Sequence, residues 1–304
     1  MTTFVDGPVR VSVPATSANL GPGYDALGIA LARWDSVIAE VGGSDVRVRV
    51  SGEGEGSLPL DETHLVVRAM RRGFEAMGVR PSGLSLRCEN TIPQARGMGS
   101  SSAAIVAGVL AARALVAGGT LLMDDDAVYA LAAELEGHPD NVAPALFGGF
   151  TIAFADGGRL GVARVAVDPR IQATLFVPPY PVETSVARKM LPSSVPHGDA
   201  ADNAGRAALL VAALSGQPEL LLEATQDRLH QDYREPAMPE SIALLRALRA
   251  DRIPAVLSGA GPTVLAFVDG VDQHAVRARA PQGWQALVLA VERDGARTQV
   301  LGRE

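Results

Sequence analysis

The sequence predicts an α+β fold, because strand-like and helix-like segments are mixed along it without the regular alternation of a doubly wound sheet. Its length of 304 residues suggests about two domains of roughly 150 residues each, or one large domain. The pattern of short strands breaks near Val167 to Pro169, so we expect domains at 1–167 and 168–304. A hydrophobic share of 47% and a charged share of 20% describe a globular chain that can bury a sizeable core.

The first half begins with a strand-like segment. Val9, Val11 and Val13 alternate with polar residues, which predicts a half-buried strand that Pro14 ends. The expected elements after it are strands at 36–40 and 46–51 paired around Gly42-Gly43, a helix at 64–77, a strand at 84–89 and a helix that follows the acidic run 124–126.

The second half is expected to hold more helix than strand. The expected strands are 151–154, 162–167, 174–177 and a last one at 284–291, with a strand–turn–strand unit at 254–270. The expected helices are 183–191, 203–214, 218–230, 239–250 and 272–280, with a loop at 193–201. The helix at 203–214 is nearly all apolar, which predicts that it is buried.

The segment from Asn90 to Ala107 joins the strand at 84–89 to a helix of small and apolar residues. Gly97 and Gly99 permit backbone conformations that other residues avoid and let a ligand approach the main chain. A serine of the run 100–102 can cap free amides at the helix start, and the free amides with the helix dipole make an anion site. An ordinary turn before a buried helix has the same pattern, so this stretch alone leaves both interpretations open.

Lysine is scarce in the chain. Lys189 is the only lysine among 27 basic residues. A Walker P-loop needs a lysine directly after the glycine that closes the loop, and no glycine here is followed by one. Backbone amides, arginine, serine and a metal ion would therefore have to hold any phosphate.

The composition argues against several other classes. A net charge of −7 does not suit a nucleic-acid surface. Cys88 is the only cysteine, so no intrachain disulfide can form and a reducing cytoplasm is the simplest compartment. We expect no targeting or membrane segment, because the longest apolar run, 103–112, is too short to span a bilayer. A hydrolase is disfavoured, because G-x-S-x-G is missing and the five histidines lack metal spacing.

Three further segments concentrate polar or small residues. Segment 14–31 is either a connector or a ligand surface, and its acid Asp25 could receive an ammonium group. The stiff turn at 136–141 is either a surface turn or part of a site. Loop 258–261 alone favours a hairpin turn. Glu134 and Glu136 lie about 200° apart round their helix, so only one of them can point into a given site.

Taken together, these segments resemble the motifs of the GHMP small-molecule kinases. PATSANLGPGYDALGIAL is similar to their first motif, PQARGMGSSSA to their phosphate loop and LSGAGPT to their third motif. EGHPDNVAPALFGG resembles the homoserine kinase branch in particular. The motifs stand in the family's order and cover essentially the whole chain. The resemblance implies a ribosomal S5 domain 2-like, ATP-binding N-terminal domain and a ferredoxin-like C-terminal domain.

The same resemblance implies roles for individual residues. Asn19, Asp25, Asn141, Arg188 and Arg234 would contact the substrate, with Asp25 on its ammonium group, the two arginines on its carboxylate, and Asn141 and Arg188 as the catalytic pair. Ser100 and Glu134 would hold Mg²⁺; Glu134 is preferred because Glu136 adjoins the turn. The ATP phosphates would be wrapped by Pro93, Gln94, Ala95, Arg96, Gly97, Met98, Gly99, Ser100, Ser101, Ser102 and Ala103.

The sequence departs from the family pattern at three positions. Met98 replaces a leucine, Tyr24 stands where phenylalanine is common, and His64 stands where relatives tend to have asparagine. The last departure leaves the adenine contacts unassigned.

The implied activity is ATP-dependent phosphorylation of the L-homoserine side-chain hydroxyl to O-phospho-L-homoserine in threonine biosynthesis. Asn141 cannot accept a proton, so we expect in-line transfer without a protein carboxylate as base, with the neighbouring Asp140 as the open alternative. The remaining alternatives are another kinase of the family, acting on a mevalonate-type, sugar or shikimate alcohol, and a non-catalytic metabolite-binding member. The expected partners are L-homoserine and ATP, with no nucleic acid and no membrane, and the family suggests a homodimer.

Overall fold

The computed structural model describes residues 4–269 and 273–302, and its strands form two sheets. The larger sheet has the order β11-β1-β2-β4-β3, with β5 paired to β2 and β6 to β5. It consists of β1 (Val9–Ala18), β2 (Leu27–Val41), β3 (Val46–Gly52), β4 (Leu84–Asn90), β5 (Phe150–Asp156), β6 (Arg159–Val165) and β11 (Arg297–Val300). The smaller sheet, β10-β7-β9-β8, consists of β7 (Ile171–Val177), β8 (Ala255–Leu257), β9 (Val264–Asp269) and β10 (Gln285–Leu289).

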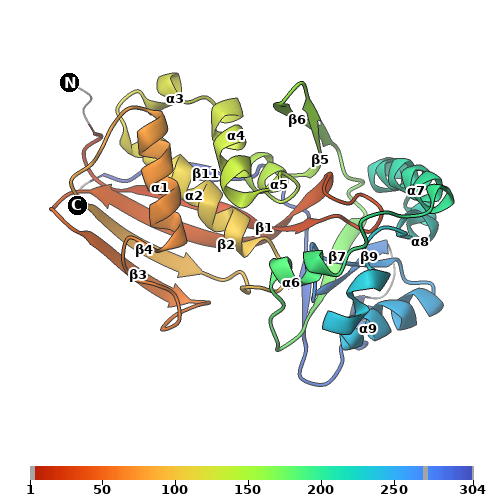
Figure 1. Ribbon diagram of the computed structural model, residues 1–304. Helices are drawn as coiled ribbons and strands as arrows, with labels where there is room; N and C mark the ends of the chain where they lie inside the picture. Colours follow the sequence, from red (N-terminus) through yellow and green to blue (C-terminus); the bar gives the residue numbers. More distant parts are fainter. Residues whose placement is uncertain (1–3, 270–272, 303–304) are drawn as a thin grey trace.

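The helices follow the same division. One group covers one face of the larger sheet (Figure 1): α1 (Leu65–Ala76), α2 (Ser100–Leu115), α3 (Gly119–Leu122), α4 (Asp125–Glu136) and α5 (Val142–Phe147). The other group lies on the side of the smaller sheet: α6 (Thr184–Lys189), α7 (His197–Gly216), α8 (Leu221–Ala224), α9 (Pro239–Ala250) and α10 (Gln273–Arg277), with 3₁₀ turns at Pro218–Leu220 and Asp232–Ala237. The mixed architecture confirms the predicted α+β class.

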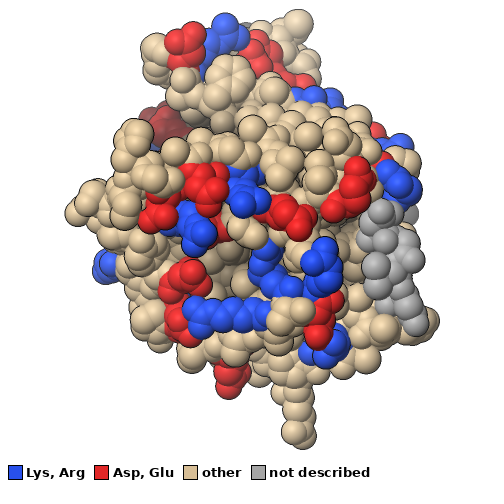
Figure 2. Space-filling model, turned by 90° about the vertical axis from the view of Figure 1, so that its right-hand side faces the viewer, with Lys and Arg blue, Asp and Glu red and all other residues tan. Residues whose placement is uncertain are grey.

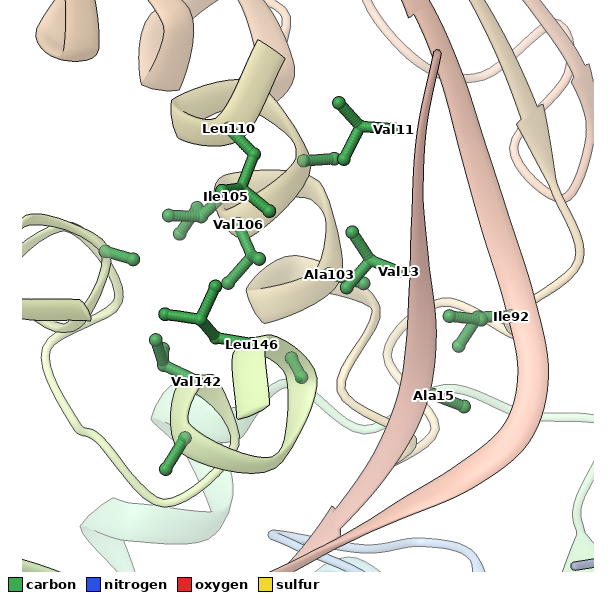
Figure 3. Packing of buried hydrophobic residues seen from close by; sticks show 14 of the residues in the cluster. Val11, Val13, Ala15, Ile92, Ala103, Ile105, Val106, Leu110, Val142 and Leu146 are labelled. Atoms are coloured by element: carbon green, nitrogen blue, oxygen red, sulfur yellow. The ribbon is translucent and has the colours of Figure 1, made fainter. Parts of the chain in front are cut away.

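Helix α2 is the centre of the larger core. It contacts β1, β2, α1, α4 and α5, which explains why its residues are apolar on nearly every side. Figure 3 shows Ala103 of α2 beside Val13 of β1, and Val106 of α2 toward Leu146 of α5. A Cβ on Gly108 would lie 2.6 Å from the Cβ of Ala69, so this glycine permits the close contact between α2 and α1. The start of α2 is thereby fixed in space, which matters for the site described below.

Two expectations about the first strands were wrong. Strand β1 continues through Pro14 to Ala18, because a register shift between Pro14 and Ala15 absorbs the missing proline amide. The strands predicted at 36–40 and 46–51 exist, but they do not pair with each other. Strand β4 lies between them and pairs parallel with β3.

The second half differs from prediction in its polar segments. The helix expected at 218–230 ends at Ala224, because the Asp227 carboxylate accepts the amides of residues 229–231 and so competes with helical bonding. Helix α7 begins at His197, inside the segment expected to be a loop, and only part of it is buried. Asp272, the expected start of the last helix, lies outside the described residues.

The passage between the sheets falls near the proposed domain boundary at 167/168. Strand β6 ends at Val165 in the larger sheet, and β7 begins at Ile171 in the smaller one. Strand β11, which the sequence did not predict, returns to the larger sheet and pairs with β1. Residues 297–300 therefore pack with the first domain rather than with the second.

Charges on the side that carries α7 to α9 are of both signs and are interspersed (Figure 2). Several of them form ion pairs. Arg246 contacts Glu235 at 2.6 Å and Asp232 at 3.1 Å, and Arg228 lies 3.3 Å from Asp202. This face thus presents mixed charge rather than a patch of one sign. Within the described residues, no helix combines the length and apolar character needed to cross a bilayer.

Candidate active site

A cavity of about 500 Å³ lies where the loop before α2, the turn before α5, α6 and loop 258–261 meet. Both polar and apolar side chains line it. Its polar wall includes Asn19, Arg96, Ser100, Ser101, Glu136, His138, Asp140, Asn141, Arg188 and Arg234. Its apolar wall includes Val37, Leu65, Val66, Ala103, Ala104 and Ala107. Because its lining is polar at one end and apolar at the other, the cavity suits a ligand that has a charged end and an apolar end.

The loop between β4 and α2 requires its glycines. Gly97 and Gly99 have φ angles of +73° and +72°, which side-chain-bearing residues rarely adopt. A Cβ on Gly97 would lie 2.1 Å from the carbonyl oxygen of Ser258, and one on Gly99 would lie 1.9 Å from Thr16 Oγ1. These positions therefore let the loop pack directly against two other segments of the cavity wall.

The start of α2 presents free amides to the cavity. The helix begins at Ser100, and among the described residues no side chain caps its first turn. The predicted serine cap is absent because Ser101 and Ser102 turn their hydroxyls to Glu136 instead. A helix of 16 residues with an open first turn carries partial positive charge at that end. This end of the cavity is suited to an anion.

Loop 258–261 packs against the loop that carries Gly97 and Gly99. The Ser258 hydroxyl donates to the carbonyl oxygen of Gly97 at 2.6 Å and lies 2.8 Å from the Ser17 hydroxyl. The Gly259 amide donates to the carbonyl oxygen of Ala18 at 3.0 Å. The three small-residue loops that the sequence singled out are thus joined to one another at the cavity.

The structure corrects the choice between the two acids at the end of α4. Glu136 accepts hydrogen bonds from the hydroxyls of Ser101 at 2.5 Å and Ser102 at 2.8 Å, and it lines the cavity. Glu134 points away, pairs with Arg72 at 3.0 Å and is 63% exposed. Helical geometry separates the two side chains as expected, but the acid nearest the turn is the one that reaches the loop.

The turn before α5 holds a buried acid and an amide. Asp140 is 2% exposed and accepts a hydrogen bond from Nδ1 of His138 at 3.0 Å. That hydrogen bond raises the pKa of His138. The Asn141 side-chain oxygen accepts from the Thr16 hydroxyl at 2.7 Å, so its amide nitrogen is the group left to face a ligand.

The far polar end of the cavity is built around an ion pair. Nη2 of Arg188 lies 2.6 Å from Oδ1 of Asp25, and Nη1 lies 3.1 Å from Oδ2. Asn19 fixes this region, because its oxygen accepts the Asp25 amide at 2.9 Å and its nitrogen donates to the Gly259 carbonyl at 2.8 Å. Asp25 does not itself line the cavity but meets it through Arg188.

Arg234 adds a second cation to the same end. It is 1% exposed, and its Nη1 donates to Nδ1 of His230 at 2.9 Å and to the Gly259 carbonyl at 3.0 Å. The guanidinium carbons of Arg188 and Arg234 lie 5.7 and 5.9 Å from the centre of the Tyr24 ring. Tyr24 thus lies against both cations, an arrangement that stabilises positive charge.

The apolar end contains one buried donor. His64 is 4% exposed, and its Nδ1 accepts the Val66 amide at 3.3 Å, so the neutral ring carries its proton on Nε2. Burial lowers the pKa of His64 and so favours that neutral form. Within the described residues Nε2 has no hydrogen-bond partner, although His64 lines the cavity.

Comparison with known proteins shows the family to which the chain belongs. Residues 64–149 match the family model for the GHMP kinases N terminal domain, and residues 209–286 match that for the GHMP kinases C terminal. The chain belongs to the GHMP kinase family. It is 55% identical over 293 residues to a homoserine kinase of Streptomyces coelicolor, covering 96% of this chain and 95% of that protein. A homoserine kinase of Clavibacter michiganensis is 50% identical over 301 residues, with 96% and 94% covered.

Solved structures show the same relationship. A homoserine kinase from Cytophaga hutchinsonii has a TM-score of 0.83 and 27% identity, covering 97% of this chain and 98% of that one. A mevalonate diphosphate decarboxylase from Staphylococcus aureus has a TM-score of 0.68 at 12% identity, covering 98% of each chain. The second likeness shows the fold alone.

In this GHMP kinase, the structure brings most of the predicted site residues to one cavity. Asn19, Asn141, Arg188 and Arg234 line it, as do the residues of 93–103 apart from Ser102. Asp25 meets the cavity only through Arg188, and Glu134 lies elsewhere. The sequence analysis gave no site role to Thr16, to His138 or to His64, although His64 lines the cavity. The departure of His64 from the family pattern could have indicated its role.

Proposed function

We propose that this GHMP kinase transfers the γ-phosphoryl group of ATP to the side-chain hydroxyl of L-homoserine, forming O-phospho-L-homoserine for threonine biosynthesis. Its curated relatives of about half identity are homoserine kinases. The observation that carries the proposal is that one cavity has an uncapped helix end at one side and, at the other, Arg188, which is paired with Asp25 just outside the lining. The first suits a polyphosphate and the second suits a zwitterionic amino acid.

The nucleotide would lie along the loop at 93–103. Its phosphates would meet the backbone amides at the start of α2, without help from a lysine. The base would lie at the apolar end between Val37, Leu65 and Ala107, where the Nε2–H of His64 offers a hydrogen bond to a ring nitrogen. A buried donor without a partner is costly, so a ligand acceptor at this place stabilises the complex.

A Mg²⁺ ion fits the same end of the cavity. Glu136 and the hydroxyls of the serines at 100–102 supply hard oxygen donors, and the Glu136 carboxylate already gathers two of those hydroxyls. We therefore propose Ser100 and Glu136 as the protein groups that hold the metal. When bound, Mg²⁺ would supply charge neutralisation to the phosphates.

The amino-acid end would hold homoserine by its two charges. Asp25 would take the ammonium group, while Arg188 and Arg234 would take the carboxylate in the planar geometry that guanidinium favours. Asn19 keeps the Asp25 backbone in place, and the Asn141 amide would orient the substrate hydroxyl. A substrate with a carboxylate alone would leave Asp25 without its ammonium partner.

The chain's own residues act chiefly by positioning. Asn141 cannot accept a proton, and the neighbouring Asp140 is buried against His138. Phosphoryl transfer through a loose transition state needs little base assistance, so alignment of the hydroxyl with the γ-phosphate supplies most of the acceleration. We propose that the proton leaves the hydroxyl without a protein carboxylate as general base. We further propose a cytoplasmic homodimer, on family resemblance.

A substrate panel tests the proposal. ADP formation is measured with L-homoserine, mevalonate, shikimate and galactose at equal concentration, and the phosphorylated product is identified by mass. We expect L-homoserine to exceed each other alcohol in kcat/KM by at least about a hundredfold, since unpaired buried charges are strongly penalised. Preference for another alcohol would assign a different kinase activity, and absence of ADP with every substrate would indicate a metabolite-binding protein.

A further inference from the structure

His230 lies behind the cavity in the segment between α8 and α9. It is fully buried, and its two ring nitrogens each have one partner. Nδ1 lies 2.9 Å from Nη1 of Arg234, and Nε2 lies 2.7 Å from the carbonyl oxygen of Gly21. The imidazole therefore bridges the buried arginine and the loop at 19–26.

The two partners fix the protonation of this ring. A guanidinium can only donate, so Nδ1 must carry a lone pair; a carbonyl oxygen can only accept, so Nε2 must carry the proton. Burial lowers the pKa of His230 to about 4, which agrees with a neutral ring. Protonation on Nδ1 would place a proton against the guanidinium and abolish the contact.

The surrounding contacts leave the ring little freedom. Asp227 lies 3.7 Å from Nε2 and accepts the backbone amides of residues 229–231, which pins the turn. The Tyr24 ring lies against His230 with centroids 5.3 Å apart. Arg234 itself has a buried Nε without a partner among the described residues, so its position depends on Nη1. Among the residues that the structure describes, His230 and Gly259 are the hydrogen-bond partners of that nitrogen.

We infer that His230 is a positioning residue: its Nδ1 holds the Arg234 guanidinium at the angle needed to receive the substrate carboxylate. The inference rests on the proposed function, because it takes Arg234 as a carboxylate ligand. The His230 ring also connects Arg234 directly to the loop that carries Asn19 and Asp25, because its Nε2 contacts Gly21 of that loop. The acid and arginine that read the two ends of an amino acid are thereby kept at a fixed spacing.

Two isosteric variants separate the two nitrogens. In His230→Gln, the amide can still donate toward the Gly21 carbonyl but no acceptor faces Arg234. In His230→Asn, the side-chain oxygen takes the place of Nδ1 as an acceptor. Loss of a hydrogen bond to a charged group corresponds to about a ten- to hundredfold effect. We expect His230→Gln to raise the homoserine KM by that factor with the ATP KM within about twofold, and His230→Asn to restore part of the loss. His197→Gln, at an exposed position, is the matched control and should leave both constants unchanged.

A neutral substrate analogue distinguishes an effect on carboxylate binding from a general loss of structure. With L-homoserine amide, which lacks the carboxylate charge, the ratio of kcat/KM between the original chain and His230→Gln should approach one. The same ratio for the acid and the amide would overturn the inference, as would equal effects of the two variants or a matching rise in the ATP KM. Failure of the unmutated chain to phosphorylate homoserine would instead overturn the proposed function.

A measurement on the unmutated protein keeps the inference testable if the variants do not fold. Nitrogen chemical shifts of ¹⁵N-histidine-labelled protein distinguish the two neutral tautomers and the imidazolium. We expect the assigned ring of His230 to be the Nε2–H tautomer at pH 7, as at His64, and to resist protonation down to about pH 4. Its shift should move when a homoserine complex forms. An Nδ1–H or charged ring at His230 would contradict the bridge.

Discussion

Arg188 holds both carboxylate oxygens of Asp25, at 2.6 and 3.1 Å, although each side chain is about a third exposed, at 34% and 38%. The hydrogen bonds to Asp25 raise the pKa of Arg188. A free amino acid carries an ammonium and a carboxylate on adjacent groups, so it can replace this pair by two new pairs. Neither protein charge is then left unmatched, which favours zwitterionic substrates.

Substitution of either partner tests this exchange. Asp25→Asn and Arg188→Gln should each raise the homoserine KM by about ten- to hundredfold, because each removes a charged hydrogen bond to the substrate. The double variant should lose less than the product of the two, since the residues share one network. Steady-state kinetics with both substrates measures this. Full additivity, or an equal rise in the ATP KM, would contradict the assignment.

The two glutamates of α4 form a matched pair for the metal. Glu136→Gln should reduce kcat by about a hundredfold or more and raise the Mg²⁺ concentration needed for half-maximal rate, because it removes a charged oxygen ligand. Glu134→Gln removes only an exposed ion pair with Arg72, worth at most about 1 kcal/mol, and should behave like the original chain. A Mg²⁺ titration of the rate decides between them. Loss of activity in Glu134→Gln alone would reverse the assignment.

Gly99 provides a steric test of the loop. In Gly99→Ala the new Cβ would lie 1.9 Å from Thr16 Oγ1 at a φ of +72°, so either the loop or β1 must shift. We expect ATP binding to weaken by at least about tenfold, measured by calorimetry with a non-hydrolysable analogue. Gly158→Ala shares the positive φ of +84° but meets nothing within 4 Å, so it should cost about 1 kcal/mol of stability and spare ATP binding. Equal binding by the two variants would argue against a tightly packed loop.

Asp35 gives a pH-dependent test of stability. This side chain on β2 is buried and accepts the amides of Thr91 and Ile92. Burial raises its pKa from 3.8 to about 6, so the unfolded chain loses its proton first and stability falls as pH rises from about 4 to about 6. That difference corresponds to about 3 kcal/mol.

The variant Asp35→Asn keeps an oxygen acceptor for both amides but does not ionise. Relative to the original chain, it should therefore gain up to about 3 kcal/mol of stability between pH 4 and pH 7. Urea unfolding at several pH values measures the difference. A difference that stays constant across this range would show that Asp35 is not held at a raised pKa.

The sequence predicted the parts of the site that follow from local chemistry. Glycines at 97 and 99 before an apolar helix predicted an anion site at the helix start, although the expected serine cap is absent. Asp25, singled out in the sequence as an acid for an ammonium group, pairs with Arg188, which lies 163 positions away in the chain. Helical periodicity also separated Glu134 from Glu136. It could not say which face of α4 turns toward α2, because that depends on packing between two helices.

Other failures have the same origin. The insertion of β4 between β2 and β3 and the return of β11 to β1 are long-range pairings without a local signature. The helix expected at 218–230 was broken by Asp227, whose side chain takes backbone amides that a helix would use. His230, which contacts Arg234, lies in this broken segment. The part of the chain that positions the second arginine of the site was therefore not predicted.

The most direct measurement is a crystal structure of the complex with a non-hydrolysable ATP analogue, Mg²⁺ and L-homoserine. We predict the triphosphate against the backbone of residues 97–101, with the homoserine hydroxyl between the γ-phosphate and Asn141 and its carboxylate on Arg188 and Arg234. A triphosphate bound away from that backbone, or an amino acid bound outside the cavity, would contradict the account.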